Sequence, residues 1–116
     1  LPQLGESAPL NGTSASDVGA RLAANEEFLL LDVRRDDEFA QSSIEGATLL
    51  PLDQLDARIE ELASWKARKI VVHCHHGGRS ETACRKLLEH GFLSVENLEG
   101  GIDAWSLTVD ATVPRY

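Results

Sequence analysis

The strongest constraint on the fold is the apolar run Phe28–Val33, which is interrupted only by Asp32 and has charged residues on both sides. A strand with one face in water alternates apolar and polar residues, whereas a strand buried on both faces reads as a continuous apolar run. We therefore predict a buried strand over residues 28–33. Strands of this kind are typical of parallel sheets that helices cover on both faces.

Short apolar runs alternate with amphipathic segments along the rest of the chain. Strands are predicted over residues 47–50, 69–73 and 94–98, and helices or helical turns over residues 14–25, 36–40, 53–64, 80–90 and 102–106. This alternation predicts an α/β domain with a mostly parallel, five-stranded or nearly five-stranded sheet flanked by helices. The fifth strand has the weakest pattern, and we place it near Leu10. The acidic run Asp36-Asp37-Glu38 favours a helix start and would also suit a basic partner.

The length of 116 residues favours one domain, and 42% apolar with 26% charged residues is typical of a folded globular protein. Residues 1–12, with their prolines and glycines, are expected to form an N-terminal extension before a domain over residues 13–116. We see no run long enough to cross a bilayer and no signal segment, so we expect neither membrane insertion nor secretion. Two cysteines do not make a disulfide scaffold, so a reducing, cytoplasmic location is expected.

The charge of the chain is unevenly distributed. Its formal net charge of −8 argues against nucleic-acid binding, which requires clustered cations. In contrast, residues 66–86 carry six basic side chains and one acidic side chain, and they include Cys74 and three of the four histidines. A cationic segment around a cysteine indicates a site for a small anion, although charges spread over a solvated surface would give the same count.

The most informative segment follows the predicted strand 69–73 and reads Cys74-His-His-Gly-Gly-Arg-Ser80. Sites in parallel sheets gather at the carboxyl ends of strands, where Cys74 lies. The two glycines allow backbone amides to turn inward, and a helix that begins at Ser80 has N–H groups without internal partners. Together with Arg79, these amides would stabilise a thiolate, so Cys74 is predicted to be a nucleophile near neutral pH. A buried cysteine acting only as a small apolar side chain would leave Arg79 and the glycines unexplained.

This loop resembles the active-site loop of rhodanese-like sulfurtransferases. Three further segments are similar to signatures of that family, namely Leu30–Arg34 with Glu38-Phe39, Ile44–Ala47 followed by Pro51, and Leu98–Trp105. The resemblance covers about residues 13–106. The tail Val109–Tyr116 is similar to the ending of rhodanese domains that occur alone or attached to enzymes that activate sulfur carriers. Ser43 stands where the family often has His, and we expect little effect on activity.

The resemblance implies a rhodanese-like fold and an enzyme, a thiosulfate sulfurtransferase-like rhodanese, that needs no cofactor. Cys74 would take a sulfane sulfur, a sulfur atom bound to another sulfur, from thiosulfate or a persulfide donor. It would hold this sulfur as a persulfide and pass it to cyanide, a thiol or a protein sulfur acceptor. The implied substrate-binding residues are His75, His76, Gly77, Gly78, Arg79 and Ser80. Arg79 would orient the sulfonate of thiosulfate, and the two histidines would either assist as cations below about pH 6.5 or be plain solvated residues.

Two other functions are open. Cysteine-dependent phosphatases place five residues between Cys and Arg, whereas four residues separate Cys74 from Arg79. The shorter loop would crowd a phosphate, although Asp32, Asp36 or Asp37 could serve as the general acid. A non-catalytic or partner-fed sulfur carrier would use the same loop to bind an anion. The presence of both Cys74 and Arg79 favours an enzyme over an inactive binding module.

The remaining candidates have simpler interpretations. Four successive residues, His73–His76, cannot normally converge on one tetrahedral ion, so we expect no metal site. Cys84 lies well inside a predicted helix, where it is expected in the core and not as a resolving thiol. Asp32 and Arg34 are expected to form a hydrogen-bonded brace at the end of a strand. Trp105 either walls a pocket or completes the core.

Overall fold

The computed structural model describes residues 10–116, so most of the predicted N-terminal extension, residues 1–12, lies outside the described residues. The elements, in chain order, are β1 (Asn11–Thr13), α1 (Ala15–Ala23), β2 (Leu29–Asp32), α2 (Asp36–Gln41), β3 (Thr48–Leu49), α3 (Leu52–Arg58), the 3-10 helix η1 (Ile59–Trp65), β4 (Lys69–His73), α4 (Gly78–Glu89), β5 (Ser94–Leu98) and α5 (Gly101–Thr108). Within residues 10–116, no helix has the length and apolar character needed to cross a membrane.

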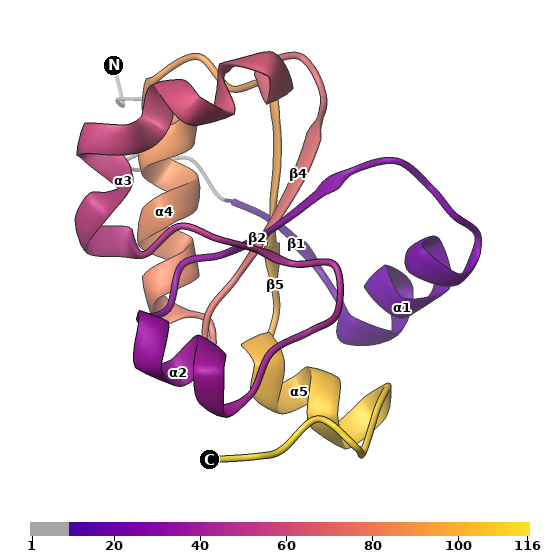
Figure 1. The fold of residues 1–116 in the computed structure, drawn as a ribbon. Coiled ribbons are helices and arrows are strands. Elements are labelled where there is room, and N and C mark those ends of the chain that lie inside the picture. The colour runs from indigo at the N-terminus through magenta and orange to yellow at the C-terminus, as the bar shows by residue number, and fades with distance from the viewer. Residues whose placement is uncertain (1–9) are drawn as a thin grey trace.

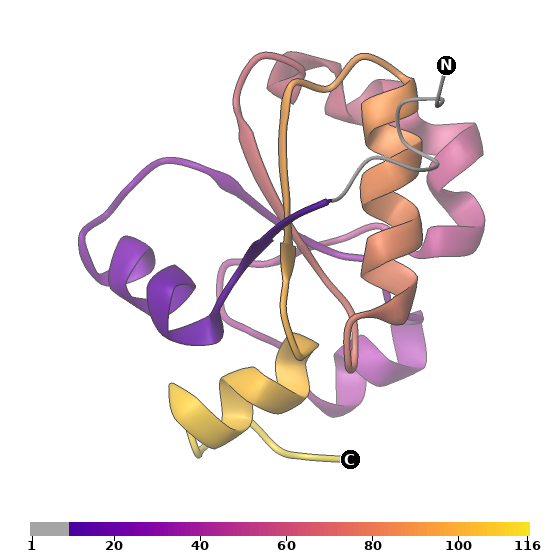
Figure 2. The same ribbon diagram turned by 180° about the vertical axis from the view of Figure 1, so that it is seen from behind.

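The five strands form one sheet in the order β1-β5-β4-β2-β3, and every neighbouring pair is parallel. Figure 1 shows α3 and α4 on one face of the sheet and α1 on the other, and the view from behind in Figure 2 gives the same arrangement. The predicted α/β architecture, a parallel five-stranded sheet flanked by helices, is therefore confirmed. The fifth strand, expected near Leu10, is β1, which pairs with β5 at the edge of the sheet.

The central strands bury side chains on both faces, as the apolar run over residues 28–33 predicted. In β2, Leu29 and Leu31 pack into the core beneath α3 and α4, whereas Leu30 packs into a second core beneath α1 and α5. β4 follows the same alternation, with Val71 in the second core. Because close-packed side chains hold the central strands on both faces, the loop that follows β4 starts from a rigid point.

One helix differs from the sequence prediction. The segment expected to be helical over residues 53–64 is an α-helix only as far as Arg58 and continues as the 3-10 helix η1. Ile59, Leu62 and Trp65 all face the core beneath α4. These side chains are three residues apart, which matches the three residues per turn of a 3-10 helix and not the 3.6 of an α-helix.

Candidate active site

The cysteine loop occupies the carboxyl end of β4, in the middle of the sheet. His73 ends β4, Cys74 follows, and α4 begins at Gly78, earlier than the start at Ser80 that the sequence indicated. Because the strands are parallel, the ends of β2 and β5 lie at the same edge and bring polar side chains next to the loop. Cys74 has no exposed surface, so its sulfur lies at the base of the loop.

The Cys74 sulfur has two polar neighbours within the loop. The backbone N–H of Gly77 donates a hydrogen bond to Sγ at 3.1 Å, and the Ser80 hydroxyl lies 3.4 Å from Sγ. The same hydroxyl lies 2.6 Å from Oδ1 of Asn97 in β5 and 3.0 Å from the Gly77 carbonyl oxygen. Its proton can therefore turn toward Asn97 when Cys74 is a thiol, or toward Sγ when the sulfur carries negative charge.

The N-terminus of α5 holds the loop from the opposite side. Two N–H groups of α5, those of Ile102 and Asp103, donate to the Cys74 and His75 carbonyls at 2.9 and 3.1 Å. Gly101 has φ +59°, and a Cβ there would lie 2.5 Å from the Cys74 carbonyl oxygen, so glycine is required. The sequence indicated Gly101 as part of a family signature, and its approach to the loop was not predicted. Because these carbonyl groups point toward α5, they point away from the sulfur, and the loop can direct a backbone N–H group toward Sγ.

Arg79 forms a bidentate ion pair with Glu38 of α2. Its Nη1 and Nη2 atoms lie 2.6 and 2.9 Å from the two carboxylate oxygens. Glu38 also accepts hydrogen bonds from the Tyr116 hydroxyl at 2.8 Å and the Arg35 backbone N–H at 3.2 Å. The hydrogen bonds from Arg79 hold the pKa of the Glu38 carboxyl well below its usual range, although burial acts in the opposite direction. Glu38 is therefore ionised at neutral pH and compensates the charge of Arg79, a contact that the sequence did not indicate.

Asp32 and Arg34, at the end of β2, form the expected brace. Nη2 of Arg34 lies 2.6 Å from Oδ2 of Asp32, and neither side chain has exposed surface. Arg34 also donates to the Ser42 carbonyl at 2.6 Å and to the Tyr116 hydroxyl at 2.8 Å. Tyr116 therefore connects this brace to Glu38, and the tail of the chain becomes part of one hydrogen-bonded network beside the loop.

The three histidines of this region have different environments. The His75 ring stacks on the Tyr116 ring with 4.0 Å between centroids and 6° between planes, and burial lowers the pKa of His75. His73 is fully buried, and burial lowers its pKa as well. The His76 side chain is 68% exposed, and its Nδ1 lies 3.9 Å from the Asp103 carboxylate. His73 and His75 are therefore neutral near pH 7, which disfavours a cationic role for His75.

Cys84 and Trp105 belong to the two cores. Cys84 in α4 is 1% exposed, and burial raises the pKa of its thiol to about 12. Trp105 in α5 is buried and packs against α1 and β2 side chains. Both side chains therefore lie in the core. This was the prediction for Cys84 and one of the two interpretations for Trp105.

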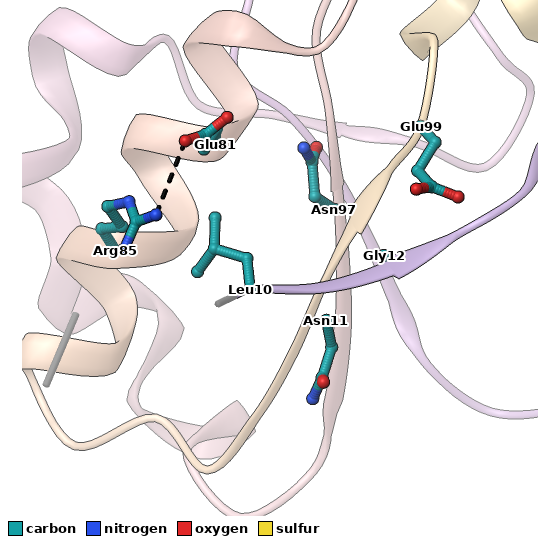
Figure 3. Close-up of a pocket in the computed structure, with 7 residues that line it drawn as sticks. All are labelled: Leu10, Asn11, Gly12, Glu81, Arg85, Asn97 and Glu99. Carbon is teal, nitrogen blue, oxygen red and sulfur yellow. Dashed lines mark ion pairs between the residues drawn. The ribbon is translucent and has the colours of Figure 1, made fainter. Parts of the chain in front are cut away.

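Two pockets lie near the loop. One, of about 340 Å³, adjoins Arg79, and its largely apolar wall includes Val33, Pro51 and Leu52. The other, of about 230 Å³ and shown in Figure 3, lies between β1, α4 and β5 and has polar walls that include Glu81, Asn97 and Glu99. Among residues 10–116, no group of three or more His, Cys, Asp or Glu side chains is arranged to hold a metal ion.

Comparison with known proteins gives one consistent result. The chain matches the family model of the Rhodanese-like domain over residues 14–108. It is 38% identical over 97 residues to a "Sulfurtransferase" of Allochromatium vinosum, covering 84% of this chain and 89% of that protein. It is 34% identical over 98 residues to the "Adenylyltransferase and sulfurtransferase UBA4" of Meyerozyma guilliermondii, covering 79% of this chain and 23% of that protein. A solved thiosulfate sulfurtransferase from Pseudomonas aeruginosa is similar with a TM-score of 0.76 at 33% identity, covering 84% of this chain and 19% of that one.

The matched residues include the cysteine loop and every helix and strand from α1 to α5. The resemblance that the loop and the flanking signatures indicated is thus confirmed by the family model, by relatives of similar length and by solved structures. The chain therefore belongs to the family of rhodanese-like domains.

Proposed function

We propose that this protein is a sulfurtransferase that carries a sulfane sulfur on Cys74 as a persulfide. The observation that carries the proposal is the position of Sγ at the base of a loop, where the Gly77 N–H donates to it and the Ser80 hydroxyl can do so. A persulfide is negatively charged near neutral pH, and fixed donors around the sulfur stabilise that charge. The similarity to a protein named "Sulfurtransferase" over 84% of this chain supports the same activity.

The reaction consists of two sulfur transfers. The Cys74 thiolate attacks the outer sulfur of the donor, and a new S–S bond forms while the S–S bond of the donor breaks. The leaving group is sulfite when the donor is thiosulfate, and it is the thiolate R–S⁻ when the donor is an organic persulfide R–S–SH. Attack by a thiolate moves no proton, so this step requires no general base. An acceptor such as cyanide then attacks the outer sulfur of the persulfide, and the S–S bond to Cys74 breaks. The products are thiocyanate and the regenerated Cys74 thiolate.

The loop residues would contact the donor and the persulfide in this reaction. They are His75, His76, Gly77, Gly78, Arg79 and Ser80. Because Cys74 has no exposed surface, the loop must open before a donor reaches Sγ. Gly77 has φ +132°, and a Cβ on Gly78 would meet nothing within 4 Å. These two glycines are therefore the positions where the backbone can move with the least resistance.

The burial of Cys74 also favours a second candidate function, a sulfur carrier loaded by a protein partner. Docking of a partner would supply the free energy that opens the loop, which a small donor supplies less readily. The similarity to part of a larger protein named as both adenylyltransferase and sulfurtransferase supports this candidate. Both cysteines are free thiols, and sulfur transfer requires that Cys74 stays reduced, so for either function we propose a reducing compartment, the cytoplasm.

Thiocyanate formation from thiosulfate and cyanide, and from an organic persulfide and cyanide, tests the proposal. We expect Cys74→Ser to abolish the enzymatic rate, because a hydroxyl cannot form a persulfide. Cys84→Ser is the matched control, since it removes the other thiol from the core without touching the loop, and it should retain most of the activity. Enzymatic turnover by Cys74→Ser would contradict the mechanism, and a wild-type protein loaded only by a protein donor would favour the carrier.

A further inference from the structure

We propose that Glu38 is a positioning residue that acts through Arg79 and makes the loop select organic persulfides over thiosulfate as sulfur donors. This inference rests on the proposed sulfur transfer through Cys74. It concerns which donor the site accepts, and three features of the described residues carry it.

The first feature is the state of Arg79. Both terminal nitrogens of its guanidinium face Glu38 oxygens, at 2.6 and 2.9 Å, so the fork that would bind a sulfonate is already filled. The Glu38 side chain is only 5% exposed, whereas the Arg79 side chain is 33% exposed and lines the apolar pocket. A ligand in that pocket therefore meets an arginine whose charge is compensated from behind.

The second feature is the state of the other cations near the loop. Arg34 and Arg35, which also line the pocket, are paired with Asp32 and Asp37 at 2.6 and 3.0 Å. On the other side of the loop, His75 is neutral near pH 7, because burial lowers its pKa. The exposed His76 ring lies 3.9 Å from the Asp103 carboxylate.

These pairings leave little attraction for a dianion. Within residues 10–116, each arginine that lines the pocket has a carboxylate partner, and the whole chain has a net charge of −8. Thiosulfate carries two negative charges, shared between its terminal sulfur and its sulfonate, and it would find backbone amides but no uncompensated arginine there. An organic persulfide needs only the amides, because it has no sulfonate.

The third feature is the shape of the pocket. Its volume is about 340 Å³, and Val33, Pro51 and Leu52 form an apolar wall beside Arg79. Thiosulfate has no carbon atoms to place against such a wall, whereas the carbon chain of an organic persulfide would bury apolar surface there. The pocket, which the loop residue Arg79 lines, is therefore where we place the R group of R–S–SH.

The loading step balances without a further reactant. The Cys74 thiolate attacks the outer sulfur of R–S–SH, one S–S bond forms as another breaks, and R–S⁻ leaves while the proton stays on the transferred sulfur. The oxidation states balance over three sulfur atoms, because the Cys74 sulfur is oxidised by one unit while the inner sulfur of the donor is reduced by one unit.

Glu38→Gln tests this role, because it removes the carboxylate charge and leaves Arg79 uncompensated. The rate constant for loading Cys74 is measured by intact mass, with thiosulfate and with the persulfide of 2-mercaptoethanol, whose carbon chain is uncharged. We expect loading from thiosulfate to become about fivefold faster, the size expected for one extra unit charge in a solvated pocket. Loading from the persulfide should change by less than about twofold, so the ratio of the two donors shifts.

Glu61→Gln is the matched control. Glu61 also forms an ion pair with an arginine, Arg58, but it lies in η1, which leads into the opposite end of β4. The control removes the same charge from the protein, and we expect an unchanged donor ratio. An equal shift in Glu61→Gln would mean that the net charge of the chain and not Glu38 sets the preference, and it would overturn the proposal.

Salt dependence in the unmodified protein gives a test that does not depend on folding of the variant. A compensated Arg79 in an acidic protein predicts that added salt leaves thiosulfate loading constant or speeds it up, because salt screens repulsion. A steep fall of the thiosulfate loading rate with salt would show an uncompensated cation and would overturn the role of Glu38. An unchanged donor ratio in Glu38→Gln would overturn it as well. Failure of both small donors to load Cys74 would overturn the proposed donor selection and favour the carrier loaded by a protein partner, and failure of a persulfide-bearing protein as well would contradict the proposed function itself.

Discussion

Two arginine–carboxylate pairs flank the cysteine loop, and they differ mainly in their access to water. Arg34 and Asp32 lie 2.6 Å apart with neither side chain exposed. Arg79 and Glu38 also lie 2.6 Å apart, but the Arg79 side chain is 33% exposed. The contact distances are the same, so the difference between the pairs comes from their surroundings.

This difference separates a structural pair from one that a ligand can sense. A buried pair loses both hydration shells, and removal of one partner leaves an uncompensated charge in the interior. A pair open to water contributes less to stability, because solvent screens it, yet its charge is still felt in the adjoining pocket. The hydroxyl of Tyr116 contacts both Arg34 and Glu38 and thereby connects the two pairs.

Arg34→Ala should have the largest effect on stability. It would leave Asp32 buried without its partner, and we expect a loss of about 3–5 kcal/mol in the free energy of unfolding. Urea denaturation followed by circular dichroism measures this loss. Arg35→Ala is the matched control, since the neighbouring arginine forms an exposed pair with Asp37 and should cost less than about 1 kcal/mol. Equal losses in the two variants would contradict the structural role of the brace.

Arg79→Ala should have a smaller effect on stability and a clear effect on thiosulfate. We expect a loss of about 1–2 kcal/mol in the free energy of unfolding, because Glu38 keeps the hydrogen bonds from Tyr116 and the Arg35 N–H. The uncompensated Glu38 carboxylate would then repel the dianion, so kcat/KM for thiosulfate should fall. Steady-state kinetics measures the fall in kcat/KM, and urea denaturation measures the loss of stability. A stability loss as large as that of Arg34→Ala would contradict the distinction between the two pairs.

The dependence of stability on acid should show the smallest effect. The folded pKa of Glu38 lies below its ordinary value of 4.5, so its stabilising contribution is present above about pH 4.5 and is lost as the pH falls further. Glu38→Gln lacks this contribution at every pH. The difference in the free energy of unfolding between the two proteins should therefore narrow between pH 5 and about pH 3. A constant difference over that range, in denaturation curves at fixed ionic strength, would contradict the assignment of the ionised pair.

The elements that the sequence predicted are those with a local pattern. The buried strand β2 follows from the apolar run Phe28–Val33, which only Asp32 interrupts, and the loop follows from the glycines between Cys74 and Arg79. The 3-10 helix η1 was missed because the apolar residues Leu55, Ile59 and Leu62 keep the mixed spacing of four and three residues that is typical of an α-helix. Local patterns therefore predicted the sheet, most of the helices and the position of the Cys74 loop.

The contacts that tune the site have no local pattern. Glu38 lies 41 positions before Arg79, and several acidic residues were equally suitable partners for that arginine. Tyr116 lies 78 positions after Glu38 and outside the region that matches the family model. Such long-range pairs depend on how α2 and the tail pack at the end of the sheet, which composition and periodicity do not specify.

Intact-protein mass spectrometry of the reduced protein after incubation with each sulfur donor tests the central claim most directly. The account predicts an added mass of one sulfur atom that is absent in Cys74→Ser, present in Cys84→Ser and removed by cyanide. An added sulfur in Cys74→Ser would contradict transfer through Cys74. The same conclusion would follow if no donor, including a persulfide-bearing protein, added sulfur to the wild-type protein.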